Sequence, residues 1–342
     1  MTTREWLTAL TAIHAASGCE DSVRDYLEGR LAPFADRVTT DGAGNLIAWR
    51  DGPKDKPLLL IAAHIDQVAL YVQQVIAGGY LRLRAPAIDV RCLPGLTVEV
   101  GGRPGVIGML PPHLRRGNEG EKPVQEDDLY IDIGVPGTDD VPPVGTPVYF
   151  RIAPRSVGPR RFSAPGLDNR ASVAALCRLL EALQGKEIPV RLACAFTVGE
   201  EIGRAGAAFL GTEQQPDLAL AVDVTFARQP DLPGQDFLME LGSGPAIGVG
   251  PNVPLPVESL ICSVAEQARI PAQREPLPGD SGTDGWALQV AGLGVPTGVI
   301  SIPLTSMHSP AEVVDVQDVE NTAELLTALA RTGFGREDLP WD

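Results

Sequence analysis

Cysteine, histidine and basic residues are scarce in this sequence. Its 342 residues include five cysteines and four histidines, and acidic residues exceed Lys and Arg so far that the formal net charge is −16. The cysteines form no C-x-x-C pair, which argues against a cysteine-type zinc site and a disulfide framework and favours reduced thiols. Phosphate binding needs clustered Lys and Arg, so the charge argues against a nucleic-acid partner.

Long apolar runs are also missing. No run of about 18 apolar residues is present, so we expect no membrane span. Residues 1–6 lack the basic-then-apolar layout of a secretory signal peptide, and together with the unclustered cysteines this predicts a cytoplasmic protein. A hydrophobic content of 44% is still enough for a large buried core and more than one domain.

Short apolar runs alternate with helical patterns along most of the chain. Runs that are fully apolar and too short for helices are typical of buried parallel strands. Their alternation with helices predicts an α/β sandwich with a mostly parallel sheet. The strands are expected at residues 58–63, 190–198, 218–224 and 296–302, the helices at 4–15, 20–31, 169–183, 205–210, 255–268, 281–290 and 316–331, and a hairpin at 37–50.

Residues 71–162 have a different character. They are rich in Gly and Pro, contain several short extended pieces and show no convincing long helix. This composition predicts a small β-barrel-like domain inserted into the α/β domain. We therefore predict a catalytic domain of residues 1–70 plus 163–342, and an inserted β-rich domain of residues 71–162 that serves assembly.

Each predicted strand leads into an acid or an imidazole. Active sites of open α/β sheets gather at the carboxyl ends of the strands, so these groups should meet at one edge. Unpaired, they would repel one another and bear a desolvation cost. A pair of divalent cations would neutralise the carboxylates and accept the imidazole nitrogens. The groups are His64 with Asp66, Glu200 with Glu201, Asp223, His308, and Asp168, which opens a helix after the inserted domain.

The spacing of these residues suggests separate roles. His64 and Asp66 are two apart, so on an extended backbone they point the same way. His64 could then bind a metal while Asp66 accepts its other ring N–H. Glu200 and Glu201 are adjacent and point apart, so one could ligate a metal while the other faces the attacking water. The histidine at position 14 lies on an apolar helix pattern and is expected to be structural.

Several stretches together resemble one co-catalytic metallopeptidase family. This is the family of glutamyl/leucyl and deblocking aminopeptidases that assemble as tetrahedral dodecamers. The resemblance covers nearly the whole chain, and its specificity lies in the combination of motifs. The matching stretches are AAHIDQVAL, GVIGMLPPHL, DLYIDIGV, GLDNRASVAAL, TVGEEIGRAGAA, AVDVTFA, LGSGPAIGVGPN, SGTDGWALQV and GVISIPLTSMHSPAEVVDVQDVEN.

The resemblance implies a dinuclear aminopeptidase that removes N-terminal residues from short peptides. The cofactors would be two divalent metal ions per subunit, zinc or cobalt and also manganese, and the subunits would form a homo-oligomer, expected to be a dodecamer. Glu200 would be the general base, and Asp66 would orient His64. One ion would be held by His64 and Asp223, the other by Glu201 and His308, and Asp168 would bridge both.

Four positions depart from the family pattern. Gln67 and Ala69 stand where the family usually has Glu and Gly, and Gly199 and Phe226 stand where Gln and His are frequent. None of them is an expected metal ligand. We therefore expect the chemistry to survive, while the departures would bear on the tuning of the ligands and on substrate preference.

Three other functions compete with this interpretation. Deacylases and carboxypeptidases of the same clan carry their second domain between the third carboxylate and the last histidine, whereas here the β-rich stretch lies between His64 and Asp168. A glycosidase would need two carboxylates on either side of a sugar, and adjacent Glu200 and Glu201 diverge. A non-catalytic scaffold would be expected to have lost ligands, and all of them are present.

Overall fold

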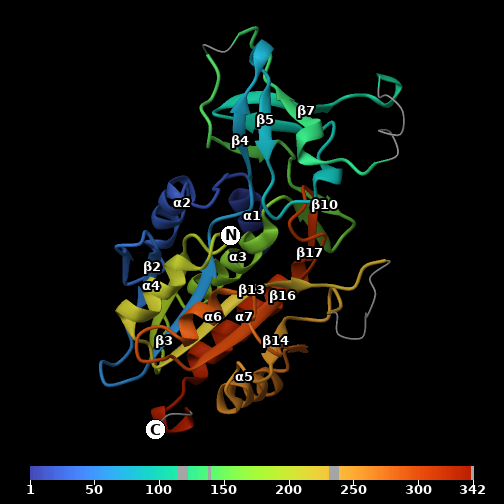
Figure 1. Cartoon of the computed structure of the whole chain (residues 1–342). Coiled ribbons are helices and arrows are strands. Elements are labelled where there is room, and N and C mark those ends of the chain that lie inside the picture. Colours follow the sequence, from blue (N-terminus) through green and yellow to red (C-terminus); the bar gives the residue numbers. More distant parts are fainter. Residues whose placement is uncertain (115–121, 138–139, 231–238, 340–342) are drawn as a thin grey trace.

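The computed structural model describes residues 1–114, 122–137, 140–230 and 239–339. A large α/β part carries a separate small barrel at one end (Figure 1). The predicted class, a mostly parallel α/β sandwich with an inserted β-barrel, is confirmed.

The large part is built on an eleven-stranded sheet. Its main path runs β1-β2-β12-β3-β13-β16-β17-β11-β10, with β14 pairing β16 and β15. The central strands β12, β3, β13 and β16 are parallel to their neighbours among these four. The strands are β1 Arg37–Thr40, β2 Leu46–Arg50, β3 Leu58–His64, β10 Arg155–Val157, β11 Arg161–Ala164, β12 Arg191–Thr197, β13 Leu218–Phe226, β14 Ala246–Val249, β15 Gln273–Pro276, β16 Thr297–Thr305 and β17 Glu312–Asp315.

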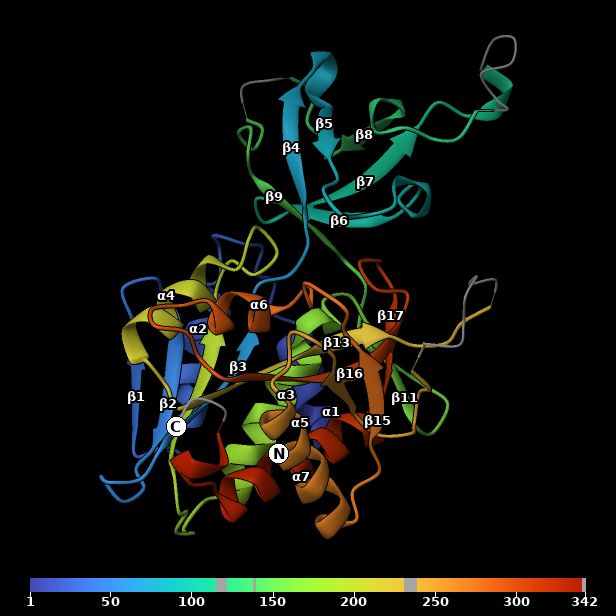
Figure 2. The same cartoon turned by 60° about the horizontal axis from the view of Figure 1, so that its bottom comes forward.

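Strand β3 shows why both faces of the sheet are buried. Leu58 and Leu60 belong to one apolar cluster, and Leu59 and Ile61 belong to another. Because successive side chains of a strand point to opposite faces, a continuous apolar run supplies both layers. Residues of α1, α2, α3, α5 and α7 pack on one face, and residues of α4 and α6 pack on the other (Figure 2).

The helices lie where the sequence patterns place them, with differences at their ends. None of the helices in the described ranges combines the length and apolar content needed to cross a membrane. The α-helices are α1 Thr3–Thr11, α2 Asp21–Leu31, α3 Leu167–Ala182, α4 Ala205–Gln214, α5 Leu255–Ala268, α6 Asp284–Gln289 and α7 Val316–Thr332, and short 3-10 helices span Ala77–Gly79, Val90–Cys92, Pro112–Leu114, Glu126–Asp128 and Arg336–Asp338.

The first helix is shorter than predicted. It ends at Thr11, so His14 lies beyond it and not on a helix face. The His14 ring stacks on Tyr149 of the barrel, with 4.7 Å between ring centroids. The apolar spacing continues past the helix end because Ile13 and Ala15 pack into the core of the large part.

The small part is a closed antiparallel barrel of six strands in the order β4-β5-β8-β7-β6-β9. It has its own apolar core, which includes Val72, Ile107 and Ile131. After the barrel the chain returns to the large sheet through β10 and β11. The domain boundaries at residues 70 and 163 stay a prediction. The barrel strands are β4 Leu70–Val75, β5 Leu81–Arg84, β6 Thr97–Val100, β7 Arg103–Met109, β8 Leu129–Asp132 and β9 Pro147–Phe150.

Candidate active site at the carboxyl edge of the sheet

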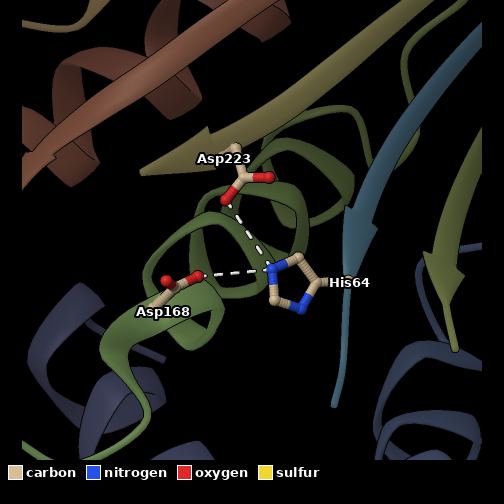
Figure 3. Close-up of side chains that lie close together, drawn as sticks. All are labelled: His64, Asp168 and Asp223. Carbon is tan, nitrogen blue, oxygen red and sulfur yellow. Dashed lines mark ion pairs between the residues drawn. The ribbon is translucent and has the colours of Figure 1, made fainter. Parts of the chain in front are cut away.

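The carboxyl ends of the parallel strands bring a first group of three side chains together. His64 is the last residue of β3, Asp223 lies in β13, and Asp168 lies at the start of α3. The His64 Nε2 atom is 3.3 Å from Asp168 Oδ1 and 3.7 Å from Asp223 Oδ1 (Figure 3). All three side chains are buried.

A second group shares Asp168 with the first. His308 Nε2 is 3.2 Å from Asp168 Oδ2 and 3.6 Å from Glu201 Oε2. In each group the candidate ligand atoms lie within 4.8 Å of one another, which is close enough for one cation to contact all three. Asp168 therefore presents one carboxylate oxygen to each group, as a ligand bridging two cations would.

The electrostatics of the cluster fit cations as well. Burial raises the pKa of Glu200 to about 9 and that of Glu201 to about 7. Neighbouring carboxylates add to this effect, because ionising several of them in a desolvated site costs free energy. Glu201 Oε1 is buried and has no hydrogen-bond partner among the described residues. Divalent cations would neutralise these groups, and mixed imidazole and carboxylate donors suit zinc, cobalt and manganese.

The shared Asp168 carboxylate and the imidazoles also shift one another's pKa. The hydrogen bond with Asp168 raises the pKa of His308 to about 9. Burial alone would raise the pKa of Asp168, but its hydrogen bonds with His308 and His64 outweigh burial and lower it. Metal ligation requires neutral imidazole, so cations binding here would displace these protons.

Asp66 contacts the ring of His64 and the backbone of Glu200 and Glu201. His64 Nδ1 is 3.1 Å from the Asp66 carbonyl oxygen and 3.5 Å from its carboxylate Oδ1. The predicted carboxylate contact to the ring is therefore the longer of the two. The Asp66 carboxylate instead accepts the backbone N–H of Glu200 at 3.1 Å and of Glu201 at 3.2 Å, and the Ser17 hydroxyl at 2.6 Å. Sequence reasoning missed Ser17, which lies 49 residues from Asp66 in the sequence.

Asn45 fixes the loop that carries the two glutamates. Its Oδ1 accepts the Val198 N–H at 3.0 Å, and its Nδ2 donates to the Gly206 carbonyl at 2.9 Å. The loop is thus tied at both ends to the turn between β1 and β2. A Cβ atom at position 206 would collide with the Val198 carbonyl oxygen and the Asn45 amide oxygen, so the turn into α4 requires glycine there.

Glu312 is the second positioning carboxylate, and sequence reasoning missed it too. Its side chain is fully buried and accepts the backbone N–H of Asp168 at 3.1 Å and of His308 at 2.9 Å. His308 has a φ of 55°, a left-handed conformation that a histidine adopts only when its surroundings hold it. One carboxylate therefore positions both Asp168, which the two groups share, and His308.

A cavity of about 380 Å³ opens beside the cluster. Its walls include the apolar side chains Val224, Leu277 and Val299, and Phe226 is 60% exposed. The Glu200 carboxylate also lines it, with Oε1 3.4 Å from Arg204 Nε. The arrangement offers a ligand set, a potential base and a small recess in one place.

Replacing Glu312 tests its positioning role. In Glu312→Gln, one acceptor becomes an amide N–H₂ that faces a backbone N–H. We expect Zn²⁺ affinity to fall by roughly 10–100-fold and the free energy of unfolding to fall by about 1–3 kcal/mol. Competition titration with a chelator and urea unfolding would measure these changes. Glu324→Gln, on an exposed position of α7, is the matched control. Wild-type Zn²⁺ affinity in Glu312→Gln would contradict the assignment.

Comparison with known proteins agrees with the site. The family model described as M42 glutamyl aminopeptidase matches residues 44–325. The chain is 36% identical over 325 residues to the lysyl aminopeptidase of Pyrococcus furiosus, covering 90% of each chain.

Two solved structures share the fold over nearly the whole chain. Aminopeptidase APDkam598 from Desulfurococcus kamchatkensis superposes with a TM-score of 0.89 at 31% identity, covering 98% of this chain and 95% of that one. The TET1 peptidase of Pyrococcus horikoshii, which can assemble into a tetrahedron or a large octahedral shell, superposes with a TM-score of 0.84 at 30% identity, covering 96% and 99%. The chain therefore belongs to the M42 glutamyl aminopeptidase family, and it is a metal-dependent aminopeptidase.

Proposed function

We propose that this aminopeptidase works with two divalent cations per subunit, zinc or cobalt and also manganese. The observation that carries the proposal is the placement of Asp168, whose two carboxylate oxygens face separate groups of ligands. His64 and Asp223 would complete one site, and Glu201 and His308 would complete the other. When bound, the cations supply Lewis acidity and a water of lowered pKa.

Glu200 is proposed as the general base. Its carboxylate lines the cavity and belongs to neither ligand group, so it is free to take a proton from the attacking water. Burial raises its pKa, which suits a group that must hold that proton and return it to the leaving amine. Arg204 and the Asp66 contact with the Glu200 N–H fix its position. Asp66 is proposed to orient His64, through its carbonyl oxygen as well as its carboxylate.

The cavity favours short peptides as substrates. A recess of about 380 Å³ beside the ligand groups can take one side chain at a time, which suits cleavage after the first residue. The removed residue is not set by the family, because a glutamyl aminopeptidase family model and a lysyl aminopeptidase relative imply opposite charges. The deacylase or carboxypeptidase alternative is disfavoured by the same family match. All five cysteines are unpaired, which supports the predicted cytoplasmic location.

We also propose that the chain forms a homo-oligomer, a dodecamer in which the β-rich domain of residues 71–162 serves assembly. The tetrahedral shell of the Pyrococcus horikoshii relative supports this, since closed shells of equivalent copies follow point-group symmetry. Exposed apolar side chains support it further. Trp286, Val290 and Leu293 lie close together in the sequence and are 38%, 69% and 97% exposed. Such a cage would admit peptides and exclude folded proteins.

Metal dependence is the broadest test. Exhaustive chelation is expected to abolish hydrolysis of aminoacyl reporter substrates, and Zn²⁺, Co²⁺ or Mn²⁺ should restore it. His14→Ala should keep metal-dependent activity, because His14 belongs to neither ligand group. Full turnover by protein that elemental analysis finds free of metal would disprove the mechanism.

Glutamine variants distinguish the proposed roles of the adjacent Glu200 and Glu201. Glu200→Gln cannot accept a proton, so kcat should fall by roughly 10²–10⁴ while both metals stay bound. Glu201→Gln loses an anionic ligand, so one metal site should weaken by roughly 10–100-fold or more, and excess metal should partly restore activity. Glu213→Gln, exposed on α4, is the matched control. If Glu200→Gln loses metal and Glu201→Gln keeps it, the two roles are reversed.

Light scattering after size exclusion tests the assembly. A dodecamer is expected at micromolar concentration, because the exposed apolar segment around Leu293 would be covered in it. A single monomer peak under these conditions would rule out the proposed cage.

A further inference from the structure

Glu275 is a cavity carboxylate that the mechanism does not use. It lies in β15 and lines the cavity, but it belongs to neither ligand group. The neighbouring Arg274 pairs with Glu258 at 2.6 Å instead of neutralising it. Among the described residues that line the cavity, none is Lys or Arg. The recess thus contains an anion that no basic residue of its lining neutralises.

Two buried hydroxyls fix this carboxylate in place. Thr225 donates to one oxygen of Glu275, and Ser301 donates to the other at 2.7 Å. Burial raises the pKa of Glu275 above its usual value, and these two hydrogen bonds lower it only in part. Donors on both oxygens stabilise the ionised form and orient it.

Strand β13 sets the distance between Glu275 and the candidate metal ligands. Asp223 and Thr225 are two residues apart on β13, which is about 6.6 Å along the strand and on the same face. Asp223 contacts the His64 group, and Thr225 contacts Glu275. Ser301, the second hydroxyl, pairs in register with Asp223 on β16. The anion therefore lies beyond the metal cluster and within the same recess.

The apolar walls of the cavity pack closely against β14. Gly248 lies opposite Glu275 in the pairing of β14 with β15. A Cβ atom there would come within 2.7 Å of the Leu277 side chain and 3.1 Å of the Val299 side chain, so glycine lets both walls approach this strand. The recess thus has apolar walls beside the Glu275 carboxylate.

Charge balance points in the same direction. Two divalent cations would balance the four carboxylates of Asp168, Glu200, Glu201 and Asp223. Glu275 lies outside that set, and no Lys or Arg of the described lining pairs with it. A substrate side chain with an apolar stem and a cationic end matches both the walls and this charge.

We propose that Glu275 selects peptides whose N-terminal residue has a cationic side chain, lysine or arginine. The proposal rests on the proposed function and adds the substrate class to it. The stem of the substrate residue lies against Leu277 and Val299, and its ammonium or guanidinium group donates to Glu275. An acidic residue in the same recess would meet a like charge in a desolvated site.

The first test uses the wild-type enzyme, loaded with Zn²⁺ or Co²⁺, and 4-nitroanilides of lysine, arginine, norleucine and glutamate. Norleucine keeps the lysine stem and lacks the ammonium group. We expect kcat/KM for lysine and arginine to exceed that for norleucine by about 10–100-fold, the scale of one charge-assisted hydrogen bond. Equal or higher kcat/KM for norleucine or glutamate would overturn the proposal. No hydrolysis of any substrate would instead refute the proposed function.

The second test uses Glu275→Gln, with Glu266→Gln on an exposed position of α5 as the matched control. Glu275→Gln should lower kcat/KM for lysine and arginine by about 10–100-fold and leave norleucine unchanged. An equal loss for all substrates, including norleucine, would overturn the proposal, because it would place Glu275 at the substrate α-ammonium or in the metal cluster. Circular dichroism and metal content identify a misfolded variant, and in that case the wild-type comparison decides.

Discussion

Repulsion among buried carboxylates is the constraint on which the rest of this structure depends. The carboxyl edge of the sheet places Asp168, Glu201 and Asp223 within a few ångströms of two imidazoles, and Asp168, Asp223 and His64 are buried. Such a cluster is costly unless positive charge compensates it. Divalent cations would supply that charge without new side chains, which is why the donor set and the burial together favour a metal site here.

The surrounding hydrogen bonds oppose the relaxation that this repulsion would otherwise cause. Asp66 and Glu312 each accept two backbone N–H groups from the segments that carry ligands. Asn45 ties the loop bearing Glu200 and Glu201 at its two ends. Because these hydrogen bonds fix the backbone, the candidate ligands are held in position without a cation. Preorganisation of this kind keeps metal geometry and base geometry constant through a reaction.

Charge compensation would also govern how the substrate binds in the recess beside the cluster. Glu275 is held by two hydroxyls and has no basic residue beside it in the described lining of the cavity. Metal cations would serve the reacting carbonyl, and an anion deeper in the recess would serve the side chain. Strands β13 and β16 set the separation between the cluster and Glu275, so the proposed chemistry and selectivity would both depend on these two paired strands.

The sequence by itself determined the features that depend on local spacing. The apolar runs predicted β3, β12, β13 and β16 because burial on both faces leaves no polar alternation, and the polar groups ending these strands marked His64, Glu200, Glu201 and Asp223 as neighbours. Only the tertiary structure decided which distant residues support them. Ser17 lies 49 residues from Asp66, and Glu312 lies 144 residues from Asp168, so no local pattern relates these partners. Glu275 was equally hidden, because its β-strand is four residues long and its hydroxyl donors come from two other strands.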